Sequence, residues 1–311
     1  MKLIFFLAVL LLIGIKIIYI ELNIHSFFNI KKNYSVKLIN DLKSQIRFNR
    51  NFRKNKKCIQ NINENLKINL DPSYNFLIAG HVYGLPYDKN LGIYPKFFRH
   101  LKYRKYNFDL VLFAGDVTRS GNKFSYDFFD HQIDELNFKN VHIAPGNHEI
   151  DTPEKRTYFF KRYGNTFKSF IFKNDLFIIL DPLENNWSIK DKQLMFLKNL
   201  LKKNYLLVDN IFIITHQLIF YERVKAHPNN FKGKAKYINF WDEIYPLAQK
   251  YENNYYFIAG DVGAIDNGFE LFCRKYENSI FLATGMGNGK RDNYLIFEKF
   301  EKKFQIKLKT F

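Results

Sequence analysis

The sequence of 311 residues contains only two cysteines, two tryptophans and three methionines, and it has far fewer acidic than basic residues. The cysteines, Cys58 and Cys273, form neither a zinc-ligand pair nor a disulfide framework. They could form one bridge in an oxidising compartment, but the sequence alone does not decide whether they pair. Internal repeats and low-complexity tracts are absent. A content of 47% apolar and 18% aromatic residues excludes a disordered chain.

The shortage of acidic residues gives a formal net charge of +18, which suggests a nucleic-acid binder. However, the excess is mostly lysine spread from end to end, and it accompanies a general excess of Ile, Asn, Phe and Tyr. A surface that binds nucleic acid more often has arginine-rich clusters in one stretch. We therefore do not expect a nucleic-acid partner. The charge still favours anionic partners, such as phosphate substrates and acidic lipid head groups.

The longest apolar run lies at the N-terminus. Leu3 to Leu22 supplies the roughly 20 apolar residues that a spanning helix needs, provided that Lys16 extends toward the membrane interface. A signal peptide has an apolar core of about 7 to 15 residues, which Leu3 to Ile15 matches, but no small-residue cleavage site follows. We favour an uncleaved single-pass transmembrane anchor over residues 1–22, with a cleaved signal peptide as the alternative.

Two considerations oppose each other on the orientation of this anchor. Lysines are more frequent after the helix than before it, and the positive-inside rule then favours a cytoplasmic body. A single N-terminal anchor before a large domain more often serves to export that domain, and long domains cross the membrane largely regardless of charge. We expect an extracytoplasmic (periplasmic) body.

The rest of the chain has two parts. Residues 23–70 are rich in Asn and Lys and poor in Gly and Pro, and their scattered apolar positions predict a helical stalk or linker. Over residues 71–311, short apolar runs alternate with segments of helical periodicity, which predicts a largely parallel α/β core. The C-terminal quarter has strands with few helices between them, and it predicts a second sheet or an antiparallel extension packed against the first.

The expected strands are Tyr74–Ile78, Leu110–Phe113, Val141–Ala144, Phe170–Phe172, Leu176–Leu180, Ile211–Ile214, Tyr255–Ala259, Phe269–Phe272, Ile280–Ala283, Tyr294–Phe297 and Phe304–Leu308. The expected helices are Tyr94–Tyr103, Tyr126–Leu136, Pro153–Tyr163, Lys190–Leu201 and Trp241–Tyr251.

Residues of the kinds that bind metals follow five of these strands directly. They are Gly80-His81, Gly115-Asp116, Gly146-Asn147-His148-Glu149, Thr215-His216 and Gly260-Asp261. Active sites of open α/β sheets form beyond the carboxyl ends of the strands, and a glycine before the polar residue lets the chain turn sharply. A lone Gly-Asp is more often a turn, and a lone strand-end histidine is more often structural. Five such endings together favour a functional site, and the tetrapeptide is the most specific of them.

Gly115-Asp116, the tetrapeptide and a later histidine resemble the calcineurin-like metallophosphoesterase superfamily over roughly Tyr74 to Phe300. The resemblance implies a four-layer fold, in which a two-sheet β-sandwich is flanked by helices and metals bind at the sheet edge. It implies that Asp116 bridges two metals and that Asn147 and His216 bind the second. It also implies that His148 stabilises the transition state or protonates the leaving group.

Two motifs depart from the family pattern. The first, Asp-x-His, reads Ala79-Gly80-His81 here, and the last, Gly-His-x-His, reads Gly260-Asp261-Val262-Gly263. By this mapping the first metal keeps only His81 and Asp116, whereas Asp261 completes the second site. Aspartate is a competent oxygen ligand for Mn, Fe, Zn or Mg. We therefore expect one strongly held divalent ion, with His81 binding the phosphoryl oxygen or orienting water and with His148 as general acid.

The expected function is hydrolysis of a phosphate mono- or diester. The alternative is a catalytically degenerate metal- or phosphate-binding accessory protein of the cell envelope, which the missing ligands favour. A nuclease is supported only by the charge. In the loop Gly285–Lys290, Asn288 is a candidate substrate-binding residue, although a plain strand connection is equally expected there. Asp181 and Asp292 are expected to be turn and capping residues, and His131 and His227 to be structural. The substrate, the metal and the oligomeric state stay open.

Overall fold

The computed structural model describes residues 52–64, 66, 71–85, 89–221, 238–263, 270–287 and 291–311. The predicted anchor over residues 1–22, Asn288 and His227 lie outside these ranges. The chain divides into two compact units, Met1–Arg50 and Asn51–Phe311, and all described residues belong to the second. None of the helices in the described ranges is long and apolar enough to cross a membrane.

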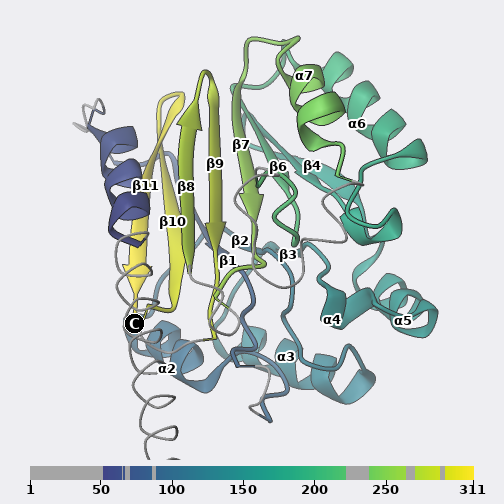
Figure 1. The fold of residues 1–311 in the computed structure, drawn as a ribbon. Coiled ribbons are helices and arrows are strands. Elements are labelled where there is room, and N and C mark those ends of the chain that lie inside the picture. The colour runs from purple at the N-terminus through teal and green to yellow at the C-terminus, as the bar shows by residue number, and fades with distance from the viewer. Residues whose placement is uncertain are drawn as a thin grey trace, which may run out of the picture. The chain divides into compact units, whose positions relative to one another are not determined.

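Two sheets form the centre of the fold (Figure 1). The first has the strand order β11-β10-β1-β2-β3, and the second has the order β4-β5-β6-β7-β9-β8. The strands of the first sheet are β1 (Tyr74–Ala79), β2 (Leu110–Phe113), β3 (Val141–Ile143), β10 (Asn293–Phe300) and β11 (Lys303–Thr310). Those of the second are β4 (Lys168–Phe172), β5 (Asp175–Ile179), β6 (Asn210–Ile214), β7 (Asn254–Ala259), β8 (Leu271–Tyr276) and β9 (Ser279–Thr284).

The middle of each sheet is parallel, as predicted from the continuous apolar runs. Strands β1, β2 and β3 pair in parallel, and so do β5, β6, β7 and β9. Antiparallel strands flank these cores, with β10 and β11 beside β1, β4 beside β5, and β8 beside β9. Among the C-terminal strands, β8, β10 and β11 extend the two sheets in antiparallel fashion and β9 continues a parallel core, so these strands do not form a sheet of their own.

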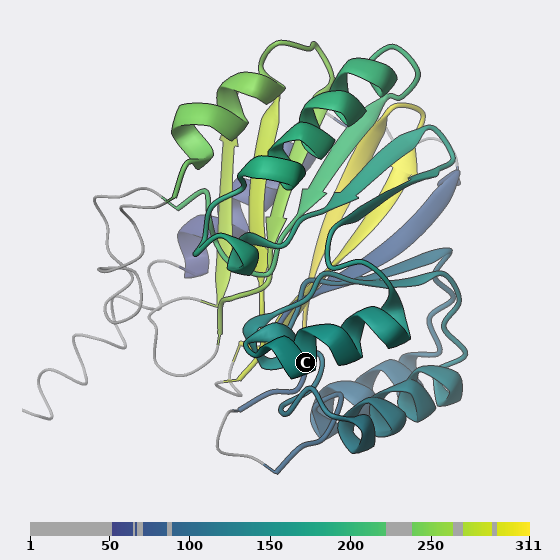
Figure 2. The ribbon, with the colours of Figure 1, turned by 90° about the vertical axis from the view of Figure 1, so that its right-hand side faces the viewer.

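Helices cover the outer face of each sheet, which confirms the four-layer arrangement (Figures 1 and 2). An apolar cluster joins the first sheet to α2 (Pro95–Arg104), α3 (Lys123–Glu135) and α5 (Pro153–Tyr163). A second cluster joins the other sheet to α6 (Asp191–Asn204) and α7 (Tyr245–Ala248). A third cluster fills the space between the sheets. The short elements are α4 (Asn147–Ile150), the 3-10 turn η1 (Pro182–Glu184) and the π-helical turn η3 (Phe240–Ile244).

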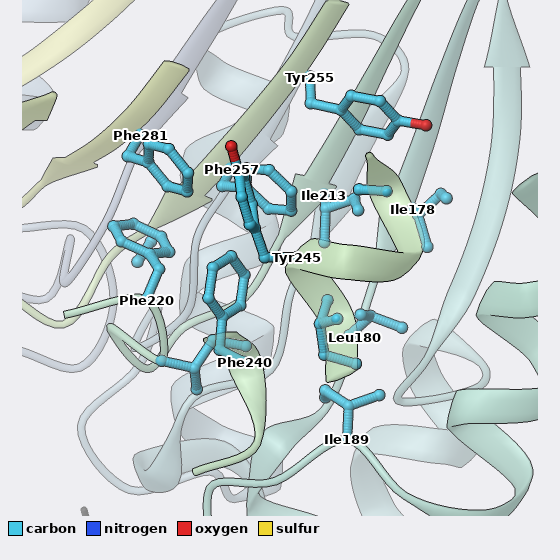
Figure 3. Packing of buried hydrophobic residues seen from close by; sticks show 14 of the residues in the cluster. Ile178, Leu180, Ile189, Ile213, Phe220, Phe240, Tyr245, Tyr255, Phe257 and Phe281 are labelled. Atoms are coloured by element: carbon cyan, nitrogen blue, oxygen red, sulfur yellow. The ribbon is translucent and has the colours of Figure 1, made fainter. Parts of the chain in front are cut away.

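Aromatic side chains dominate the packing. Between the sheets, Phe76 stacks on Phe297 and meets Phe212 edge to face, with ring centroids 4.8 and 5.3 Å apart. On the outer face of the second sheet, Phe240 meets Phe257 at 5.0 Å (Figure 3). Each such side chain, when fully buried, stabilises the fold by about 1.5–3 kcal/mol. The buried aromatic residues thus belong to the cores on both faces of the sheets.

All predicted strands are present, with ends shifted by at most a few residues. A helical segment is present where one was predicted over Trp241–Tyr251, but it begins with the π-helical turn η3, continues as α7 and ends at Ala248. The backbone N–H of Tyr245 donates to the carbonyl of Phe240, five residues earlier, and Pro246 beside it has no N–H for the regular helical bond. The short elements α4 and η1 lie below the length that periodicity detects.

Residues 52–63 form a helix that lies along one side of the sandwich, where the edge strands β8 and β11 lie. The Asn55 side chain bonds the backbone of β8, and Asn63 both donates to and accepts from Ile306 of β11, at 2.8 and 3.0 Å. A disulfide joins Cys58 to Cys273 of β8. The helix thus covers backbone groups that edge strands otherwise leave unpaired.

Candidate metal centre

The carboxyl ends of five parallel strands meet at one edge, and they come from both sheets. Strands β1, β2 and β3 lead to His81, Asp116 and Asn147, and β6 and β7 lead to His216 and Asp261. The sheets approach closely here, since a Cβ built on Gly260 would lie 1.9 Å from the carbonyl oxygen of Ala114. Residue 260 is therefore glycine because a side chain would not fit there, and also because the chain turns at this point.

Asp116 lies at the centre of this edge and is almost fully buried. One carboxylate oxygen, Oδ2, is 3.2 Å from His216 Nε2 and 3.5 Å from His81 Nε2. The other, Oδ1, accepts a hydrogen bond from the backbone N–H of His148 at 3.1 Å. Both Asp116 and His81 have positive φ, 55° and 52°, a conformation that is uncommon for residues other than glycine and is often found at functional sites.

Glu149 holds the two loops around Asp116 together. Its carboxylate is fully buried and accepts from the backbone N–H groups of Asp116, Gly146 and Thr118, at 2.8, 2.9 and 3.0 Å. Burial and the nearby Asp116 raise the pKa of Glu149 to about 7. The sequence placed Glu149 in the tetrapeptide but gave no signal that it joins the second-motif loop to the third.

The hydrogen bonds of His216 suit it as a metal ligand. Its Nδ1 donates to the carbonyl of Ala114 at 2.8 Å, which leaves the lone pair on Nε2, as in most metal-bound histidines. Buried Nε2 has no partner of hydrogen-bond geometry. It lies 3.2 Å from Asp116 Oδ2 and 3.8 Å from Asp261 Oδ1. Ligands about 2.1 Å from one metal lie about 3 to 3.5 Å apart, so this spacing matches a shared ion, with Asp261 slightly outside the range.

The electrostatics also favour a cation. Burial opposes ionisation of Asp116, but the charges and hydrogen bond of His216 and His81 outweigh it, so the pKa of Asp116 is well below its usual range. Burial likewise disfavours the charged form of His216, and the Asp116 carboxylate outweighs it and raises the pKa of His216 to about 10. Without a metal ion, the proton on His216 supplies the positive charge that stabilises the Asp116 carboxylate. A bound metal ion would replace that proton.

No group of three or more His, Cys, Asp or Glu side chains that could hold a metal ion is found in the described part of the chain. The described residues bring two such donors together, Asp116 Oδ2 and the unpartnered Nε2 of His216, which lie 3.2 Å apart, whereas Asp261 Oδ1 lies 3.8 Å from Nε2. Carboxylate and imidazole groups are both ligands of divalent ions.

His148 lies beside this group and is held at both ring nitrogens. Nδ1 is 2.7 Å from the carbonyl oxygen of Arg119, and Nε2 is 3.0 Å from the hydroxyl of Tyr83. Tyr83 is fully buried, and its ring lies 4.5 Å from that of His81. The sequence analysis missed Tyr83, whose only signal was its place two residues after His81 in a strand-end loop.

The remaining candidates have structural roles or lie outside the described residues. Asp181 caps η1 and pairs with Arg156, and Asp292 accepts from the backbone N–H of Gly287, which confirms them as turn and capping residues. His131 on α3 pairs with Glu135 at 3.1 Å.

A four-layer sandwich with buried Asp and His side chains at the shared strand-end edge defines the metallophosphatase class of fold. The chain belongs to the calcineurin-like phosphoesterase family, whose model matches residues 38–284. This is a family of metal-dependent phosphoesterases, so a divalent ion and a phosphate ester are the cofactor and substrate class that membership implies.

Solved structures with the same fold include a purple acid phosphatase from yellow lupin (Lupinus luteus) seeds, with 15% identity and a TM-score of 0.58. That match covers 78% of this chain and 52% of the lupin chain, so this chain spans about half the length of the lupin enzyme. A second match is the anchor in the inner membrane complex of Plasmodium, with 12% identity, a TM-score of 0.47, and coverage of 72% of this chain and 80% of that one.

A third is a predicted phosphoesterase from Streptococcus pneumoniae, with 12% identity, a TM-score of 0.36, and coverage of 76% and 89%. At 15% identity the lupin match shows the fold alone. A search of curated protein sequences finds no match.

Proposed function

We propose that this protein hydrolyses a phosphate mono- or diester with one strongly held divalent ion, bound by Asp116, Asn147, His216 and Asp261. The observation that carries the proposal is the buried Asp116 carboxylate, which faces the unpartnered Nε2 of His216 at the sheet edge. Manganese, iron, zinc and magnesium are all compatible with a set of carboxylate, amide and imidazole donors.

The surroundings of the first metal position support a single ion. Ala79 supplies no ligand atom and belongs to the apolar cluster beneath α2, α3 and α5. Gly263 has φ +89°, and a Cβ there would lie 2.9 Å from the backbone of both Gly285 and Met286. The fold at residue 263 therefore has no room for the histidine that the family pattern places there.

A bound divalent ion would polarise the phosphoryl oxygen and lower the pKa of a bound water. In this proposal His81 contributes its buried imidazole, whose Nδ1 is unpartnered, to orient the phosphoryl group or the water. His148 is partly exposed and delivers a proton to the leaving oxygen. Glu149 keeps Asp116 in place through its three backbone hydrogen bonds.

We further propose that the N-terminal anchor holds this domain on the extracytoplasmic side of a membrane, where the substrate would be lipid-linked or a glycan phosphate. The Cys58–Cys273 disulfide supports an oxidising compartment, because structural disulfides are rare in the cytosol of most organisms. Thiol labelling of intact cells with and without reductant tests this assignment. Free thiols in freshly isolated protein would contradict it.

The alternative is an accessory protein that binds metal or phosphate without turnover. Two observations favour it: ligands of the first metal are missing at positions 79 and 263, and the described residues contain no group of three or more His, Cys, Asp or Glu side chains that could hold a metal ion.

The test uses the full-length protein in mild detergent, loaded with Mn²⁺, with metal content measured beside hydrolysis of paired mono- and diester substrates. Asp116→Asn is compared with Asp127→Asn, which changes an exposed carboxylate on α3. We expect about one metal per chain and turnover that only Asp116→Asn abolishes. Two tightly held metals would contradict the single-ion site, and bound metal without turnover of either ester would favour the accessory function.

A further inference from the structure

The tripeptide Asn-x-Ser/Thr, which accepts N-linked glycans in secreted proteins when x is not proline, occurs twice in the sequence. One copy spans residues 33–35, outside the described ranges, and the other is Asn186-Trp187-Ser188, between η1 and α6. Because the chain is rich in asparagine, the motif is weak evidence by itself. What distinguishes Asn186 is how the fold presents it.

Asn186 lies at the tip of a tight turn. The backbone N–H of Ser188 donates to the carbonyl of Asn185 at 3.1 Å, and these two residues form an isolated antiparallel bridge. The two residues between them both have positive φ, 51° for Asn186 and 73° for Trp187, which is the pattern of a type I′ turn. Asparagine tolerates this conformation better than most residues, so Asn186 suits its position.

One side of this turn is held in the core, and the other faces solvent. Trp187 is buried in the outer core of the second sheet, and its backbone N–H donates to the carbonyl of Pro182 at 2.7 Å. Asn186 is exposed, whereas the buried Asn239 and Asn293 use their side-chain amides in hydrogen bonds within the fold. A glycan on Asn186 therefore replaces none of the hydrogen bonds found among the described residues.

Two features of the chain agree with a compartment in which such glycans are attached. Disulfides such as Cys58–Cys273 persist in secreted proteins and in the lumen of the endoplasmic reticulum, and they are rare in the cytosol. The apolar N-terminal run is of the kind that directs a chain to a membrane. We propose that Asn186 is an N-glycosylation site, and this proposal rests on the extracytoplasmic location proposed above.

The donor in this transfer is an oligosaccharide attached to a lipid diphosphate. The side-chain nitrogen of Asn186 forms a bond to the anomeric carbon of the first sugar, and the bond from that carbon to the diphosphate breaks. The nitrogen loses one proton as the lipid diphosphate leaves. Ser188 is fully buried in the folded protein, whereas the transferring enzyme must reach the whole tripeptide. Transfer therefore precedes the packing of this turn.

The experiment expresses full-length variants in the cells from which the chain originates, in an Asn33→Gln background that leaves one motif. Asn186→Gly removes the acceptor amide and keeps the positive φ without strain. Asn185→Gln is the matched control, since it changes the neighbouring asparagine, which belongs to no motif. A peptide N-glycosidase should lower the apparent mass of the background protein and of Asn185→Gln by one step and leave Asn186→Gly unchanged. In water labelled with ¹⁸O, mass spectrometry should find a labelled aspartate at position 186.

An unmodified Asn186 amide in the wild-type protein would overturn the proposal. A glycan on Asn33 alone would show that the compartment is right and the site is wrong. If neither asparagine carries a glycan, the proposal also fails, and the thiol labelling described above then separates it from the proposed location. A disulfide-bonded Cys58 in that case would retain the oxidising compartment while the glycan is refuted.

Discussion

The helix over residues 52–63 is held to the sandwich by one covalent bond and two asparagine side chains, and removal of the covalent bond has a calculable effect. The Cys58–Cys273 disulfide joins positions 215 residues apart. The chain-entropy relation gives about 5 kcal/mol for a closed loop of that length at 25 °C, whereas typical disulfides contribute about 2–4 kcal/mol. A domain whose total stability is about 5–15 kcal/mol would lose a large part of it.

We expect the double variant Cys58→Ala, Cys273→Ala to unfold in urea with a free energy about 3–5 kcal/mol below that of the oxidised wild type. Reductant should move the wild type toward the variant and leave the variant unchanged. The slope of the transition decides whether the whole domain unfolds together. A smaller early transition with a shallow slope would mean that the helix detaches first.

The hydrogen bonds of Asn63 allow the contribution of the helix to stability to be tested without changing the cysteines. Asn63→Ala removes both hydrogen bonds to Ile306, whereas Asn61→Ala changes an exposed residue of the same helix. We expect Asn63→Ala to cost about 1–2 kcal/mol and Asn61→Ala to have little effect. Equal urea midpoints for the oxidised wild type, the cysteine variant and Asn63→Ala would refute the view that this helix stabilises the sandwich edge.

Three other changes have defined outcomes. In Gly146→Ala the new Cβ would lie 2.1 Å from Asp116 Oδ1, so metal affinity measured by competition with a chelator should fall at least about tenfold. Gly164→Ala, where nothing lies within 4 Å of the Cβ but φ is +82°, should lose some stability and keep the metal affinity. Burial lowers the pKa of His142 to about 4, so the unfolded state binds a proton that the folded state rejects. Stability should fall as the pH drops from about 6.5 to 4, and His142→Phe should lose this dependence in urea unfolding. Lys299→Met leaves the buried Asp175 carboxylate without the ammonium group that lies 2.7 Å from it, and it should lower the free energy of unfolding by about 3–5 kcal/mol. Adding Asp175→Asn to Lys299→Met should restore part of this loss. No recovery in the double variant would contradict this pairing.

The sequence predicted the parallel strands and the polar residues at their ends because both depend on local patterns, whereas the four layers were implied by the family resemblance. Apolar runs mark buried strands wherever they pair, and a glycine followed by Asp, Asn or His marks the end of such a strand. This rule alone brings His81 and Asp116 together, because they follow neighbouring parallel strands, whereas the approach of His216 also depends on how the second sheet packs on the first. The rule needs only parallel strands that share an edge, which strand–helix alternation provides.

What escaped the sequence depends on contacts between distant segments. The pairing of β10 with β1, the docking of the 52–63 helix on β8 and β11, and the Cys58–Cys273 bond each join residues far apart in the chain. The periodicity of apolar residues along the sequence does not show which distant segments contact each other. Tyr83 and Glu149 were missed for a related reason, since their roles are hydrogen bonds to other loops and their residue types are ordinary at those positions.

The two motifs that depart from the family pattern lie next to each other in the fold. The first-motif and last-motif loops touch, because a Cβ built on Gly80 would lie 2.3 Å from the Cα of Gly260. The ligands lost at positions 79 and 263 therefore come from neighbouring loops, and restoring one cannot restore the first metal. Ala79→Asp would place a carboxylate in the apolar cluster of the first sheet, near Asp116 and without a histidine at 263 to share the ion. We expect it to destabilise the fold by several kcal/mol while the Mn²⁺ content stays at about one per chain. A second tightly held Mn²⁺ in Ala79→Asp would show that the fold still retains a first metal site.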